Sequence, residues 1–331
     1  MGRSLIVTRL GYLYIVGMTV WVVERLLFFD RWWPFALLNT LASFLFLPLP
    51  IFLVWALWRR ERPLLVSLLL PTAVFAALFG KLFLPSLPDA RAVQSTVTVM
   101  TFNVLFKNEA YDAMTNSIQT AVPDVVGLQE LTDEIAAELL DSLQEKYPYH
   151  TLDTGELDSG VGLLSRYPLE QVEQLPPPMP LDRAIEAVVI IEGQRVHLFV
   201  VHLTPNQVFS HPLAEFAPLI KERYGRRASE VAWLKAKIDA IEEPVLLLCD
   251  CNLTDTAQVH AQFSTFLKDS FQEAGWGFGH TFQPPVVSVP IQRIDYIWHS
   301  DEFIALEAFV GLDGGSDHLP TVAKLGFVMP P

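Results

Sequence analysis

Residues 244–252 read PVLLLCDCN, and this stretch decides the fold of the C-terminal part of the chain. A run of Val and Leu that follows a proline and ends in polar residues predicts a strand buried on both faces. Asp250 and Asn252 lie two residues apart at its end, so their side chains point to the same side of the sheet edge. Because Asp and Asn also follow strands as turn formers, this stretch alone leaves a site and a simple turn equally open.

The charge of the chain divides it into two parts. Residues 1–92 contain nine Lys and Arg against four Asp and Glu, a net charge of +5, whereas the remainder contains 14 against 33, a net charge of −19. We therefore predict two domains, a membrane anchor over residues 1–92 and a second domain over residues 93–331.

The first part contains three long apolar stretches, at about residues 10–29, 35–58 and 64–84. Each is about as long as a helix that crosses the hydrocarbon core of a bilayer. A cleaved signal peptide would explain only the first stretch. We predict three transmembrane α-helices that partner the lipid bilayer.

Basic residues on the short flanks predict the orientation of these helices. Arg3 and Arg9 precede the first stretch, and Arg59, Arg60 and Arg62 lie in the second loop. Positive residues are enriched on the cytoplasmic side, so we expect a cytoplasmic N-terminus and an extracytoplasmic second domain.

The chain has only two cysteines, Cys249 and Cys251, both in the opening stretch. On an extended strand their side chains point to one face, but a bond between them would strain the geometry. We expect no disulfide framework and interpret both as small buried packing residues.

Alternating strand and helix patterns follow residue 92, and polar side chains recur at strand ends and in tight loops. These residues are Asn103, Glu130, His202, Asp250, Asn252, Asp295, Asp317 and His318. Asn103 and Glu130 offer the oxygen ligands of an open Mg²⁺ site, which leaves positions for water and a substrate phosphate. The histidines suit contact with a phosphoryl oxygen, and Asp295 is the candidate partner that orients one of them.

A basic run lies within the predicted helical stretch 214–241 and comprises Lys221, Arg223, Arg226 and Arg227. Such a run is typical of a solvated helix face. Contact with anionic lipid headgroups is the alternative.

Seven motifs together carry a resemblance to a known family. They are TFN (101–103), LQE (128–130), SGVGLLSRYPL (159–169), VHL (201–203), DCN (250–252), RIDYI (293–297) and SDH (316–318). In this order they resemble the endonuclease/exonuclease/phosphatase superfamily, Mg²⁺-dependent phosphoesterases with a four-layer α/β sandwich. The resemblance covers residues 96–327.

The resemblance implies a metal site in which Glu130 holds Mg²⁺, or Mn²⁺ in its place, with Asn103 beside it and Asp317 close by. Arg183 is a weaker candidate for substrate binding. The family usually shows Gly-Asp-Phe-Asn where this chain has Cys-Asp-Cys-Asn at 249–252, so the packing behind the site must differ.

The resemblance also implies the catalytic roles. Asp250 would orient or deprotonate the attacking water, and Asn252 would hold water and phosphate. The Asp295–His318 pair would stabilise charge on the phosphate, with His202 as a further phosphate contact.

The net charge of the second domain and the predicted membrane anchor indicate the class of substrate. A net charge of −19 opposes tight nonspecific binding of nucleic acid, and tethering at a bilayer favours a lipid phosphate. Aromatic residues in irregular loops, Phe209, Phe216, Trp276 and Phe278, are candidates to contact an acyl or prenyl chain. Three spans followed by this domain resemble the VanJ-like bacterial proteins linked to glycopeptide resistance, for which a lipid-pyrophosphate phosphatase activity is inferred.

The sequence therefore leaves three hypotheses for the function. The first is a membrane-anchored Mg²⁺-dependent phosphoesterase acting on a lipid phosphate ester, phosphodiester or pyrophosphate. The second is an extracytoplasmic nuclease, and the third is a catalytically idle binding module on a membrane anchor.

Overall fold

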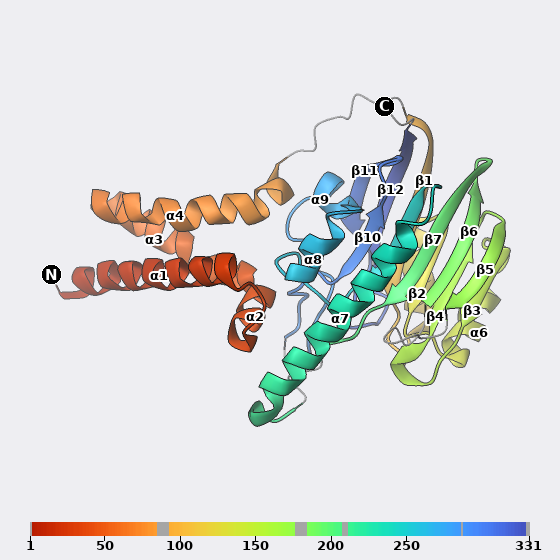
Figure 1. Ribbon diagram of the computed structural model, residues 1–331, viewed down its shortest axis with the longest axis horizontal. Helices are drawn as coiled ribbons and strands as arrows, with labels where there is room; N and C mark the ends of the chain where they lie inside the picture. The colour runs from red at the N-terminus through yellow and green to blue at the C-terminus, as the bar shows by residue number, and fades with distance from the viewer. Residues whose placement is uncertain (1, 85–92, 176–183, 207–210, 286, 329–331) are drawn as a thin grey trace. The chain divides into compact units, whose positions relative to one another are not determined.

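The computed structural model describes residues 2–84, 93–175, 184–206, 211–285 and 287–328 (Figure 1). The chain forms two compact units, an N-terminal helical unit and a C-terminal α/β unit.

Over residues 2–84, the N-terminal unit consists of helices and short connections. The helices are α1 (Gly2–Leu27), α2 (Trp33–Thr40), η1 (Ala42–Phe46), α3 (Pro48–Arg59), α4 (Arg62–Phe79) and η2 (Gly80–Phe83). Three helical segments are long and apolar enough to cross a membrane, Leu5–Leu27, Ala42–Arg59 and Arg62–Phe83.

The second of these segments is shorter than the stretch 35–58 that we expected to be one helix. The helix breaks after Thr40, and a 3₁₀ segment leads into α3, which begins at Pro48. Proline has no backbone N–H to donate and fits the first turn of a helix, so a new helix begins there.

The described residues of the C-terminal unit form two mixed six-stranded sheets. One has the order β11-β12-β1-β2-β4-β3 and the other β5-β6-β7-β8-β10-β9. The strands of the first sheet are β1 (Val93–Asn103), β2 (Val125–Gln129), β3 (Tyr149–Asp153), β4 (Val161–Ser165), β11 (Phe303–Val310) and β12 (Thr321–Val328). Those of the second are β5 (Leu169–Leu175), β6 (Ala184–Ile191), β7 (Gln194–His202), β8 (Val245–Asp250), β9 (Lys268–Asp269) and β10 (Asp295–His299).

Helices pack on the outer faces of the two sheets (Figure 1). The side chains of α5 (Tyr111–Ala121) and α6 (Asp133–Leu143) form a core with β1 and β2. The second sheet is accompanied by α7 (Phe216–Ile238) and α8 (Gln258–Phe263), whereas α9 (Ser270–Ala274) lies against β11 and β10. The predicted four-layer α/β sandwich is confirmed.

The inner faces of the two sheets meet closely at the central strands. A Cβ at Gly127 of β2 would lie 2.9 Å from side-chain atoms of Leu248 on β8, so only glycine allows this approach. All six residues of β8 are buried, as the sequence of the strand predicts. This contact places the ends of β1 and β2 beside those of β7 and β8.

Candidate active site

Asp250 ends strand β8 and lies at the centre of a polar cluster at the strand ends of the second sheet. Strands β7 and β8 are parallel, with His202 opposite Asp250. Strand β10 is antiparallel to β8, with Asp295 opposite Asp250 on the other side. Strand register therefore brings these three side chains to the same edge, although they are far apart in the sequence.

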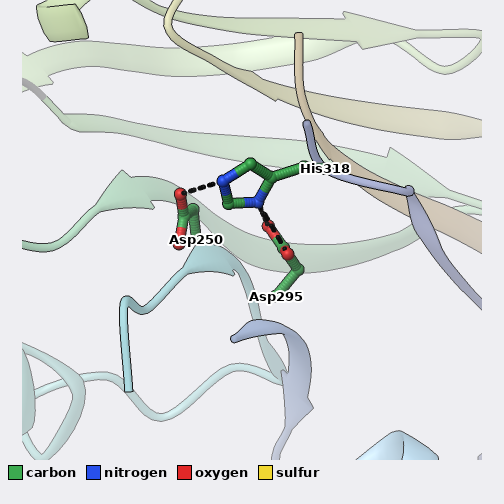
Figure 2. Close-up of side chains that lie close together, drawn as sticks. All are labelled: Asp250, Asp295 and His318. Carbon is green, nitrogen blue, oxygen red and sulfur yellow. Dashed lines mark hydrogen bonds and ion pairs between the residues drawn. The ribbon is translucent and has the colours of Figure 1, made fainter. Parts of the chain in front are cut away.

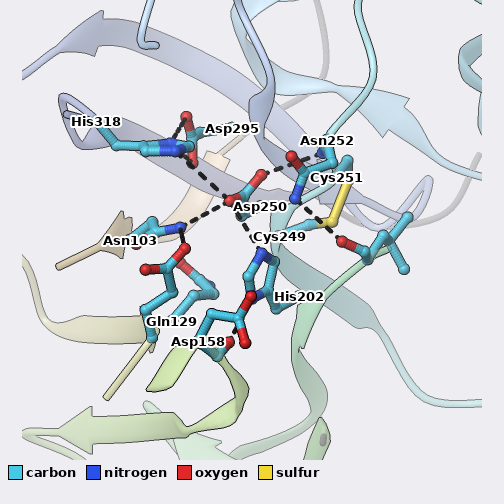
Figure 3. Close-up of polar contacts among 12 residues, drawn as sticks. Asn103, Gln129, Asp158, His202, Cys249, Asp250, Cys251, Asn252, Asp295 and His318 are labelled. Carbon is cyan, nitrogen blue, oxygen red and sulfur yellow. Dashed lines mark hydrogen bonds and ion pairs between the residues drawn. A yellow bond between two sulfur atoms is a disulfide. The ribbon is translucent and has the colours of Figure 1, made fainter. Parts of the chain in front are cut away.

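Asn103 connects this cluster to the first sheet. It ends β1, and its Nδ2 donates to Oδ2 of Asp250 at 2.8 Å and to Oε1 of Glu130 at 2.9 Å (Figure 3). The N–H of Leu105 donates to its Oδ1 at 3.0 Å, which fixes the orientation of the amide. Asn103 thus sets the positions of two carboxylates from different sheets.

His318 and Asp295 form a buried pair beside Asp250 (Figure 2). Nδ1 of His318 lies 2.9 Å from Oδ2 of Asp295, and its Nε2 lies 3.8 Å from Oδ2 of Asp250. Burial by itself lowers the pKa of His318, but the negative charges of Asp295 and Asp250 raise it to about 10. The ring is therefore positively charged at neutral pH, and it points that charge at Asp250.

The carboxylate of Asp250 is surrounded by donors and charges. Oδ1 accepts from the N–H of Asn252 at 3.1 Å, and Nε2 of His202 lies 3.4 Å from Oδ2. Burial, followed by the negative charge of Asp295, raises the pKa of Asp250 above that of an ordinary aspartate. A carboxylate with a raised pKa is a better proton acceptor near neutral pH.

The tautomer of His202 follows from its other contact. Nδ1 lies 3.1 Å from the carbonyl oxygen of Asp158, which can only accept, so Nδ1 carries a proton. Nε2 therefore faces the cluster. Asp158 was not singled out in the sequence, because a backbone carbonyl carries no residue-specific signal.

Two of the predicted site residues have a left-handed backbone. Glu130 has φ of 59° and Asn252 has φ of 51°. This conformation is costly for residues other than glycine and recurs at functional sites. The side chain of Asn252 is tied to β7, since its Nδ2 donates to the carbonyl of Leu203 at 3.0 Å.

Glu130 and Asp317 form a second acidic group next to the cluster. Burial is the main cause that raises the pKa of Asp317, and the negative charges of Glu130 and Asp250 raise it further, although His318 acts in the opposite direction. Carboxylate oxygens that repel one another in this way match the ligands of a hard divalent cation, while Asn103 turns its Nδ2 toward Glu130 as a donor. Their residue types are those of such a site, and the assignment of Glu130 and Asp317 as metal ligands stays a prediction.

A different group also has the spacing of metal ligands. Asp250, Asp295 and His318 offer ligand atoms that all lie within 4.8 Å of one another. A histidine must be deprotonated to bind a metal, and the pKa of His318 is raised to about 10. Glu130 and Asp317 stay the metal ligands that the sequence predicts.

The predictions for Arg183 and for the two cysteines are not confirmed. Arg183 lies outside the described residues. Cys249 and Cys251 form a disulfide, so the expectation of unbonded packing residues is wrong. Strand β8 ends at Asp250, and the chain bends there until the two Cα atoms are 5.2 Å apart, within the normal range for a disulfide.

Arg227 corrects the interpretation of the basic run as one solvated face. It is 2% exposed, and its Nη1 donates to the carbonyls of Asn252 and Thr204. Glu230, one turn later and also buried, accepts from the N–H and hydroxyl of Thr204. Arg227, Glu230, Val231 and Leu234 are spaced three or four residues apart or adjacent, so they share one buried face of α7. This spacing is the sequence signal that indicates the burial of Arg227.

Known structures share this fold at low sequence identity. A Bacteroides vulgatus endonuclease/exonuclease/phosphatase is 19% identical with a TM-score of 0.56, and the match covers 71% of this chain and all of that one. D. rerio TDP2 complexed with a single-strand DNA product is 19% identical with a TM-score of 0.55, covering 70% and 100% of the two chains. The human Nocturnin catalytic domain with a bound sulfate anion is 16% identical with a TM-score of 0.55, covering 72% and 96%.

None of the curated protein sequences matches the chain. The model of the Endonuclease/Exonuclease/phosphatase family matches residues 100–318, which is most of the α/β unit and includes Asn103, Asp250 and His318. The chain therefore belongs to the endonuclease/exonuclease/phosphatase family.

Proposed function

We propose that the chain is a membrane-anchored, Mg²⁺-dependent phosphoesterase that hydrolyses a phosphate ester, phosphodiester or pyrophosphate of a lipid. The observation that carries the proposal is the carboxylate of Asp250, held by Asn103 with charged His318 on one side and His202 on the other. Three apolar helices in the same chain support the membrane part of the proposal.

Asp250 acts on the attacking water in this proposal. Its carboxylate orients the water and accepts its proton as the oxygen attacks phosphorus. Positive charge on His318 stabilises the negative charge that develops on the phosphoryl oxygens, while Asp295 holds the ring. His202 and Asn252 make the remaining contacts to phosphate and water.

Glu130 and Asp317, with Asn103, would hold the Mg²⁺ ion. When bound, this ion neutralises charge on the phosphate and on the leaving oxygen. Asn103 also donates to Glu130, so the same amide orients a metal ligand and the proton acceptor.

Exposed apolar side chains support a lipid substrate. Many side chains on the helical unit are apolar and exposed, among them Leu13, Val20, Ile51, Val54, Val66 and Leu69, as expected for surfaces that face lipid. Leu157 is 65% exposed and precedes Asp158, whose carbonyl contacts His202. It therefore offers an apolar contact beside the site.

The aromatic residues predicted to contact a lipid chain differ in exposure. Trp276 is 74% exposed, whereas Phe216 and Phe278 are half-buried, and Phe278 stacks on His280. Phe209 lies outside the described residues. Trp276 is thus the best placed of the set for contact with lipid.

A substrate panel tests the function. The full chain, purified in detergent with Mg²⁺, is expected to release phosphate from undecaprenyl pyrophosphate in preference to cleaving sphingomyelin or plasmid DNA. A chelator should abolish the activity, and added Mg²⁺ should restore it. Cleavage of plasmid DNA alone would establish the nuclease alternative, and no turnover of any substrate would favour the binding module.

We further propose that the α/β unit lies outside the cytoplasm. The arginines at the N-terminus and in the loop between α3 and α4 support a cytoplasmic location for those segments. Three spans then carry the chain to the other side. Alkaline phosphatase fused after Pro331 should be active in cells, since it needs an oxidising compartment. An inactive fusion, together with activity of a cytoplasm-specific reporter fused at the same position, would reverse the orientation.

A further inference from the structure

The Cys249–Cys251 disulfide encloses the residue on which the proposed chemistry depends. It closes a ring of three residues with Asp250 in the middle (Figure 3). The two Cα atoms are 5.2 Å apart, whereas two residues of extended strand span about 6.6 Å. The disulfide therefore requires a bend in the backbone at Asp250.

The same bend orients the carboxylate. It directs the N–H of Asn252 back to Oδ1 of Asp250 at 3.1 Å, and it gives Asn252 its left-handed backbone. Past the bend, the N–H of Cys251 donates to the carbonyl of Ile294 at 2.9 Å. With Oδ1 held in this way, Oδ2 faces Asn103 and the two histidines.

Both cysteines are fully buried, so separated sulfur atoms have little free space. Reduction by a dithiol breaks the S–S bond, adds two electrons and two protons to form two thiols, and converts the dithiol to its cyclic disulfide. The sulfur atoms must then move from bonding to van der Waals distance. The bend at Asp250 is the part of the backbone that can open to supply this distance.

We propose that the Cys249–Cys251 disulfide is a positioning element that holds the carboxylate of Asp250 in its catalytic orientation, so that full activity requires the oxidised form. This inference rests on the proposed phosphoesterase function. A displacement of about 1 Å at a catalytic group costs on the order of 10²-fold in rate. The expected loss is in kcat, because the other groups assigned to metal and phosphate are held independently of the disulfide. Glu130, Asp317, His202 and His318 lie elsewhere in the chain, and the side chain of Asn252 is held by the carbonyl of Leu203.

A purely structural disulfide would behave differently. Its stabilisation of the folded state grows with the length of the loop that it closes, and this loop is of the shortest kind. We therefore expect reduction to lower kcat strongly while the melting temperature changes little. A disulfide that only stabilised the fold would show the reverse.

The test uses the full chain in detergent with Mg²⁺ and the lipid substrate that it turns over fastest. The kinetic constants kcat and KM are measured before reduction with dithiothreitol, after reduction and after reoxidation, with thiols counted by alkylation and mass spectrometry. We expect kcat to fall about 100-fold on reduction, with KM changed by less than about threefold, and to recover on reoxidation. The double variant C249S/C251S, which keeps the side-chain shape of the reduced form, should have the low kcat in all conditions.

The double variant also controls for binding of the reductant to the metal, because any loss of its activity in dithiothreitol has that cause. The inference would be overturned if kcat were unchanged in a sample in which alkylation shows that both cysteines are reduced. It would also be overturned if denatured protein that was never treated with reductant contained two reactive thiols. An oxidised chain that turns over no substrate would instead refute the proposed function, and this inference with it.

Discussion

Asp250→Asn is expected to lower kcat by about 10²- to 10⁴-fold, the typical contribution of a general base. An amide has nearly the same shape as the carboxylate but cannot accept the proton of the attacking water. Both oxygens of Asp250 accept hydrogen bonds, from Asn252 and Asn103, so the amide also loses one of these contacts. The measurement is the steady-state rate with the preferred lipid substrate at saturating Mg²⁺.

The melting temperature shows that this loss is not one of folding. The pKa of Asp250 is raised by burial and by Asp295, so its charged form is disfavoured, and a neutral side chain relieves that cost. We expect a melting temperature within about 4 °C of that of the wild type. Asp301→Asn, at an exposed position, should leave kcat unchanged. An Asp250→Asn variant with the wild-type rate would support the idle binding module.

His318→Gln is the second variant with a large expected effect, a loss of about 10²- to 10⁴-fold in kcat. Glutamine can still donate a hydrogen bond to Asp295 but carries no charge toward Asp250 and the phosphate. The rate is compared with that of His211→Gln, a change at an exposed histidine that we expect to be silent. Equal rates for the two variants would exclude a catalytic charge at His318.

The stability of the same variant should depend on pH. The pKa of His318 is raised from 6.5 to about 10 in the folded protein, so the charged ring contributes its full stabilisation below pH 6.5 and loses it as the pH rises toward 10. The melting temperature of His318→Gln should therefore lie furthest below that of the wild type near pH 6, and the gap should close toward pH 10. A gap that widens with pH would contradict the assigned charge.

The positions of the site residues at strand ends could be predicted because the signals are local. The apolar run before Asp250 and the β-branched run before Asn103 each specify a strand and the point where it ends. Parallel neighbours then place their carboxyl ends at one edge of the sheet. The structure accordingly places His202 beside Asp250 in the second sheet, whereas Asn103 reaches Asp250 from the first sheet.

Other features could not be predicted because they depend on distant packing. Arg227 looked like part of a solvated run, yet the face of α7 that carries it is turned toward the ends of β7 and β8. The two cysteines looked unable to bond because a straight strand was assumed. Past the bend at Asp250, the N–H of Cys251 donates to the carbonyl of Ile294, a residue distant in the sequence that no local pattern identifies.

The sequence by itself determined the strands, the helices and the chemical character of each strand end, because these depend on hydrophobic periodicity and on side-chain chemistry within a few residues. It also determined the three apolar segments, because their length and composition suffice. Only the tertiary structure decided which polar groups meet. Asn103 bridges Glu130 and Asp250, His318 pairs with Asp295, and Cys249 bonds Cys251, because strand register and close packing of the two sheets set distances that are independent of separation along the chain.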